Sequence, residues 1–191
     1  MFHEFSHRHT ACTVDGVSDI IIISRESKGS SQIGKESNYN GVFAPTSDVD
    51  HGSLIQVADR FLVVSLRRTV DQDKYCSMIK TNALVDIQRY SQAYDDNDNE
   101  VGPPSFNVVQ ASVVSFAEFV TAKLLQEDPG LLPTTSYLLR MQSTVDVKRP
   151  SDPTLEQRDR ILLHGRPYQV DAIDDVKYPG VYQVQLSEDR R

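Results

Sequence analysis

Cysteine is scarce in this chain, which has only Cys12 and Cys76 among its 191 residues. Two cysteines cannot form the framework of bridges that holds small secreted domains together. We therefore expect a reducing compartment, in which both thiols act as small buried apolar groups rather than as reactive ones.

Long apolar runs are also missing. The longest stretches, such as residues 20–23, fall far short of the roughly 20 residues that a membrane-spanning helix needs. The start of the chain lacks the basic and apolar regions of a secretory signal. These absences predict a protein with no membrane partner, which acts in the cytoplasm or in a particle assembled there.

Positive charge is the third shortage. The chain has 20 Lys and Arg against 27 Asp and Glu, a formal net charge of −7 and a pI of about 5.2. No basic cluster stands out, whereas a general nucleic-acid binder usually presents a basic face. An acidic surface would instead weaken non-specific attachment to DNA.

Common catalytic motifs are absent. The sequence has no G-x-S-x-G elbow, no H-E-x-x-H pair and no complete phosphate-binding loop. Gly34 and Lys35 come closest to such a loop, but Glu36 stands where its hydroxyl residue is required. We predict that the protein is not an enzyme and has no cofactor.

Two clusters deserve a test as metal sites. His3, His7, His9 and Cys12 have potential ligand atoms, but their spacing matches no closed zinc pattern. The acidic tract at residues 95–100 lacks the central glycine and the final glutamate of a calcium loop. We predict no metal site, with an N-terminal arm or edge strand and a solvated acidic loop instead.

What the sequence does contain is alternation of apolar and polar residues. An apolar run at residues 161–163 and alternating stretches at 168–172 and 182–187 are separated by turns at Gly165 and Gly180. Such alternation between glycine breaks is typical of half-buried antiparallel strands. It predicts a three-stranded meander in the core of a small β-barrel or sandwich.

The same pattern occurs 107 positions earlier, in residues 52–82. A register slip of one residue would turn the core face to solvent, so the shared spacing is informative. It predicts a mainly β protein with two similar small antiparallel β-barrel or sandwich modules and long loops. The matched positions are Leu54 and Ile161, Phe61 and Tyr168, Val63 and Val170, Leu66 and Ile173, Tyr75 and Tyr182, and Ile79 and Leu186.

The remaining segments extend this plan. Residues 106–125 fit a helix or a strand, and their β-branched and aromatic content favours a strand. Pro103 and Pro104 mark the predicted boundary between an N-terminal β-module with a polar arm, residues 1–102, and a C-terminal barrel-like module, residues 103–191. Further strands are predicted at residues 19–24, 84–90 and 136–147, and polar loops at 25–41, which we expect to be flexible, and at 148–157.

One stretch resembles a known family. The pattern D-R-I-x-x-x-G-x-x-Y-x-V-x-x-I-D runs from Asp159 to Asp174, and an alternating segment follows from Gly180 to Asp189. Together they resemble the C-terminal part of tailed-bacteriophage head–tail connector proteins of the head-completion or stopper class. These proteins are often small β-barrels, and the resemblance covers about a third of this chain.

The resemblance implies a non-enzymatic virion structural protein of the phage neck, assembled in the host cytoplasm. It implies a homo-oligomeric ring that joins the capsid to the tail and helps retain packaged DNA. The implied partners are the portal or adaptor protein and tail proteins, with packaged DNA nearby but not specifically bound. Two other hypotheses are a tail-completion or baseplate protein and an OB-like binding module, against which the lack of basic and aromatic clustering counts.

Two charge pairs occupy equivalent positions in the repeat. Arg67 and Arg68 in the first module correspond to Asp174 and Asp175 in the second, at the same offset of 107. Opposite charges at corresponding edges could orient modules or neighbouring subunits, because they favour one register over others. The alternative is that both are ordinary solvated turns, since exposed ion pairs contribute only about 0–1 kcal/mol.

Overall fold

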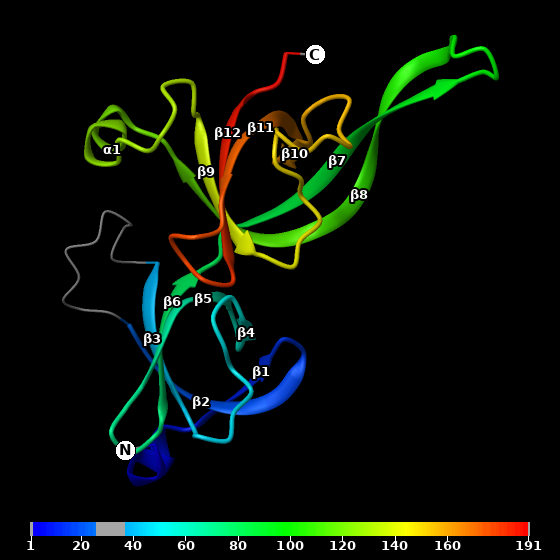
Figure 1. The fold of residues 1–191 in the computed structure, drawn as a ribbon. Helices are drawn as coiled ribbons and strands as arrows, with labels where there is room; N and C mark the ends of the chain where they lie inside the picture. Colours follow the sequence, from blue (N-terminus) through cyan, green and yellow to red (C-terminus); the bar gives the residue numbers. More distant parts are fainter. Residues whose placement is uncertain (1, 26–36, 191) are drawn as a thin grey trace. The chain divides into compact units, whose positions relative to one another are not determined.

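The computed structural model describes residues 2–25 and 37–190, and this part of the chain is mainly β, as the sequence predicts (Figure 1). It divides into two compact units, each with its own closed six-stranded barrel. The first unit contains residues 1–82, 141–143 and 175–182, and the second contains the rest. Most of the flexible loop predicted at residues 25–41 lies outside the described residues.

The first barrel follows a short 3-10 helix, η1 (His3–Arg8). All its neighbouring strands are antiparallel, in the order β1-β2-β3-β6-β5-β4. The strands are β1 (Thr10–Val14), β2 (Val17–Arg25), β3 (Asn38–Phe43), β4 (Leu54–Gln56), β5 (Arg60–Arg68) and β6 (Lys74–Lys80).

Its core contains two of the apolar residues that the sequence singled out, Phe61 and Val63. Phe61 and Val63 are buried in a cluster with Ile55, and both cysteines belong to the same cluster. Burial raises the pKa of Cys12 to about 11 and that of Cys76 to about 12, because the apolar surroundings disfavour a thiolate. Both cysteines are therefore packing residues, as expected.

The second barrel has the same architecture. Its strand order is β7-β8-β9-β12-β11-β10, which repeats the order of the first barrel strand for strand. Its elements are β7 (Ala83–Tyr94), β8 (Glu100–Phe119), α1 (Ala122–Glu127), β9 (Tyr137–Gln142), β10 (Arg160–Leu163), β11 (Arg166–Asp174) and β12 (Val181–Glu188).

The segment at residues 106–125 is a strand up to Phe119, which confirms the favoured interpretation, but it then turns into α1. The side chain of Thr121 accepts a hydrogen bond from the Leu124 backbone N–H at 3.2 Å, the usual way to satisfy a free donor at a helix start. Leu124 packs on Val120 and Leu138, so this short helix lies over one part of the barrel core.

The predicted boundary at residues 102 and 103 is wrong. The chain divides after Asn82, because β7 pairs with β8 and β10 and so belongs to the second barrel. Pro103 and Pro104 lie inside β8 and not in a linker. Both are exposed, and a strand tolerates proline where its N–H groups are not needed for pairing.

The repeat is real in topology, but its spacing is not uniform. Ile55 pairs with Phe61, and Ile161 pairs with Tyr168, so the offset between β4 and β10 is 106 (161−55). This offset is one less than 107 because three residues, 57–59, connect β4 to β5, whereas only two, His164 and Gly165, connect β10 to β11. Leu54, matched to Ile161 at the sequence level, is only half-buried.

Between the last strands of the two barrels, β6 and β12, the offset is larger than 107 instead of smaller. Val63 pairs with Met78, and Val170 pairs with Leu186, so the offset between β6 and β12 is 108 (186−78). The connection at residues 175–180 is one residue longer than that at 69–73. Tyr182 is therefore half-buried instead of facing the core, while Leu186 is fully buried, as predicted, and so is Val184 between them.

Only β5 and β11 keep the predicted offset of 107. Both strands carry a β-bulge at the same place, after Val63 in β5 and after Val170 in β11. Because a bulge redirects the following side chains, its recurrence at matched positions is a stronger sign of similarity than strand order alone. No helix in the described residues is long and apolar enough to cross a membrane.

Candidate interaction site

The two barrels differ most at one hairpin. In the first barrel, Asp15 and Gly16 form a two-residue turn between β1 and β2, both with positive φ as a type I′ turn requires. In the second barrel, residues 88–109 occupy the equivalent place, since Ile87 pairs with Gln110 as Val14 pairs with Val17. We call residues 88–109 the ribbon, and it extends beyond the rest of its barrel (Figure 1).

The ribbon exposes apolar side chains without a basic residue near its tip. Tyr94, Val101 and Val108 are each about half exposed, at 50%, 51% and 53%. No Lys or Arg occurs in residues 90–122, whereas four acidic residues fall within 95–100. The ribbon therefore combines exposed apolar side chains with charge of one sign.

The tip of the ribbon closes on itself. The Asp95 carboxylate accepts hydrogen bonds from the backbone N–H groups of Asn97 and Asn99, each at 2.9 Å. It also accepts two from the Asn99 side-chain amide. Hydrogen bonds from the Asn99 side chain and from these backbone groups lower the pKa of Asp95. The acidic tract is thus a compact turn.

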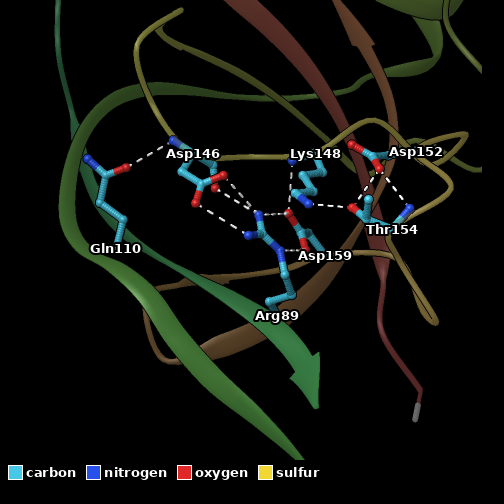
Figure 2. A network of polar contacts seen from close by, with 7 residues as sticks. All are labelled: Arg89, Gln110, Asp146, Lys148, Asp152, Thr154 and Asp159. Atoms are coloured by element: carbon cyan, nitrogen blue, oxygen red, sulfur yellow. Dashed lines mark hydrogen bonds and ion pairs between the residues drawn. The ribbon is translucent and has the colours of Figure 1, made fainter. Parts of the chain in front are cut away.

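Arg89 fixes the base of the ribbon to the loop between β9 and β10 (Figure 2). Its guanidinium donates from Nε and Nη2 to the two carboxylate oxygens of Asp159, each at 3.0 Å. It also donates to Asp146, at 3.1 Å to Oδ1 and at 3.2 Å to the backbone oxygen. Hydrogen bonds to Asp159 and Asp146 raise the pKa of Arg89 further above its usual value.

The same network holds the loop at residues 143–159 in shape (Figure 2). The backbone N–H of Lys148 donates to Asp159 at 2.8 Å, and that of Asp146 donates to Gln110 at 3.1 Å. The Lys148 ammonium reaches the hydroxyl of Thr154. The Pro-containing loop predicted at residues 148–157 therefore has a definite conformation, fixed mainly by hydrogen bonds to charged groups.

The entry to β10 carries two further ion pairs. Arg158 donates to Asp171 at 2.8 Å, and Arg160 donates to Asp189 at 2.7 Å. The carboxylates are 4% and 0% exposed, so these pairs tie β10 to β11 and to the C-terminal segment in a partly dry environment. Together with Asp159, they give structural roles to the charged residues at the start of the family-like pattern.

An aromatic pocket of about 400 Å³ lies at the base of the ribbon. It is lined by Tyr90, Pro104, Phe106, Gln157 and Arg160. The Phe106 ring meets Tyr90 edge to face with centroids 5.6 Å apart, and the Arg160 guanidinium carbon lies 3.7 Å from the Phe106 centroid. This contact is a cation–π arrangement that holds Phe106 in a fixed orientation.

The four charged residues predicted as contacts lie at equivalent strand ends. Arg67 and Arg68 are the exposed last residues of β5, and Arg67 stands over the Tyr75 ring at 4.4 Å. Asp174 is the last residue of β11, and Asp175 begins the following connection. Their role in contacts between modules or subunits stays a prediction.

The N-terminal histidines have local roles. His3 and His7 lie on η1, and His9 stacks on Phe2 with centroids 4.3 Å apart. Within residues 2–25 and 37–190, no three His, Cys, Asp or Glu side chains are grouped to hold a metal ion.

Sequence reasoning missed both the Arg89 network and the aromatic pocket. Arg89 and Asp159 are 70 positions apart, and neither sits in a recognisable motif with the other. A usable signal was the run Arg158, Asp159 and Arg160, because alternating charges at a strand start need partners when the strand is buried. No protein-family model and no curated protein matches this chain.

Proposed function

We propose that this protein is a structural connector of the tailed-phage neck, which joins the portal and capsid to the tail as part of a homo-oligomeric ring and helps retain packaged DNA. The observation that carries the proposal is the ribbon. It is an exposed element with apolar and acidic side chains, added to one of two barrels of identical strand order and fixed at its base by a buried ion pair.

A rigid barrel with a fixed protrusion suits a joining role. Loops and hairpins on stable scaffolds commonly carry binding functions, since the scaffold limits the entropy lost on binding. The net charge of −7 supports passage of DNA without sticking, because like charges repel phosphates. The family-like stretch from Asp159 to Asp189 supports the assignment to the neck.

The test is assembly with the portal protein of the same virus. We expect the purified protein to form rings on portal particles in negative-stain images and to co-sediment with them. Replacing residues 92–104 by Asn-Gly joins Ser91 to Ser105, which already pair, and leaves the Arg89 network in place. This variant should keep its β-sheet circular dichroism and bind portal or tail proteins at least about tenfold more weakly.

The matched control removes exposed apolar atoms elsewhere. Val70 and Val176 are 98% and 83% exposed, so Val70→Ala and Val176→Ala should assemble normally. If the wild-type protein binds neither portal nor tail proteins, the connector function is wrong. If the shortened variant assembles like the wild type, the ribbon is not the contact element.

A further inference from the structure

The aromatic pocket has the walls of a site for a flat or ring-shaped apolar group. Tyr90 and Phe106 present ring surfaces at an interplanar angle of 71°, and Pro104 adds a rigid apolar edge. The Arg160 guanidinium carbon lies 3.7 Å from the Phe106 centroid, a cation–π contact that stabilises this ring position. A volume of about 400 Å³ is within the range of sites that bind small ligands or short peptide segments.

Each polar side chain that lines the pocket can donate a hydrogen bond. Tyr90 has a phenolic hydroxyl, Gln157 an amide, and Arg160 a guanidinium. The charge of Arg160 is already balanced by the fully buried carboxylate of Asp189, at 2.7 Å. The pocket therefore suits a neutral ligand rich in carbonyl oxygens better than an anion.

Acidic residues occur on both elements that form the pocket. Glu156 is an exposed residue of the loop between β9 and β10, and the tip of the ribbon has four acidic residues within 95–100. Gln157 follows Glu156 directly and lines the pocket. A cation beside the bound group would be attracted, whereas the phosphates of a nucleic acid would be repelled.

From these observations we propose that the aromatic pocket binds a proline-containing segment of a partner protein, in the polyproline II conformation and with a basic residue next to the proline. Proline rings pack on aromatic faces, and a polyproline II segment displays carbonyl oxygens and has no N–H at proline. The inference goes beyond the connector function and does not depend on it.

The test uses the full-length protein and three short fluorescein-labelled probes. The first peptide has a Pro-x-x-Pro core with a flanking Arg, the second has both prolines replaced by Ala, and the third has the Arg replaced by Glu. We expect saturable anisotropy changes with the first, and binding at least about tenfold weaker with the other two. In ¹⁵N–¹H spectra, the Gln157 side-chain amide should shift during the titration.

The informative variant is Phe106→Leu, which removes an aromatic face but keeps an apolar side chain. This substitution should weaken binding of the first peptide by at least about tenfold. Phe119→Leu is the matched control, because Phe119 is on the same strand, is 61% exposed and lies outside the pocket lining. It should leave binding unchanged, and thermal melts of both variants report whether they fold.

Several outcomes would overturn the proposal. No saturable binding of the first peptide at 1 mM, equal binding of the alanine peptide, or spectral shifts confined to residues outside the pocket would each exclude it. Tighter binding of a short oligo-dT than of the peptide would identify a nucleic-acid site instead. If Phe106→Leu does not fold, Tyr90→Leu replaces it with the same expected loss. None of these results bears on portal assembly, so the connector proposal is judged separately.

Discussion

The carboxylate of Asp159 serves three donors at once. It accepts from Nε and Nη2 of Arg89 and from the backbone N–H of Lys148. The side chain is 0% exposed, so a loss of charge here leaves Arg89 without its main partner. Removing one member of a buried pair usually costs about 3–5 kcal/mol, far more than the pair itself contributes.

We therefore expect Asp159→Asn to lower the free energy of unfolding of the second barrel by about 3–5 kcal/mol. The side chain of Asp146, which also contacts Arg89, is 56% exposed. Asp146→Asn should cost no more than about 1 kcal/mol. Urea titrations followed by hydrogen exchange would measure both changes within the second barrel. Equal effects of the two substitutions would show that Asp159 is not the main anchor.

A substitution at Leu186 tests the core of the second barrel. It is fully buried and pairs with Val170 on β11, so Leu186→Asp would place a charge where no partner is available. We expect loss of the second barrel, seen as fast hydrogen exchange across β10 to β12. Val176→Asp, at a residue that is 83% exposed in the connection between β11 and β12, should have little effect. A soluble, fully folded Leu186→Asp protein would contradict the core assignment.

At the scale of elements, the opposite charge pairs lie at matched ends of β5 and β11. We expect Arg67→Asp/Arg68→Asp to impair ring assembly more than folding, since both arginines are exposed. Adding Asp174→Arg/Asp175→Arg should restore assembly at low salt. The difference should vanish near 1 M salt, where the Debye length is about 3 Å. Light scattering of each variant measures ring formation, and normal assembly of the first one would refute complementary ends.

Elements also show where sequence patterns succeed. The strands β10 to β12 were predictable because alternation and glycine turns are local signals; His164 and Gly165 indeed have positive φ. The prediction of one uniform offset of 107 was wrong for the first and last strands. One residue more or less in a connection moves a whole strand along the sequence without changing its apolar pattern. The ribbon was missed because Pro103 and Pro104 resemble a linker, although β8 tolerates them where its backbone is exposed.

For the whole molecule, the β fold and the pair of similar modules could be predicted from the periodicity of the sequence, but the closure of each sheet into a barrel could not. Each barrel closes through strands distant in sequence, β1 with β4 and β7 with β10. The candidate site depends on such distant partners: Tyr90, Phe106 and Arg160 come from β7, β8 and β10. Single-sequence patterns identify residues that need burial, but they do not identify which distant residue will cover them.

The short turn at Asp15 and Gly16 has a practical consequence. The second barrel shows that this fold accepts a long insertion at the same hairpin, and both turn residues are exposed. The carboxylate of Asp15 accepts from the Leu54 N–H at 2.9 Å, so an addition is best made after Gly16. An epitope tag or fluorescent group placed there would label the first barrel without entering its interior, and would mark its orientation in images of an assembled particle.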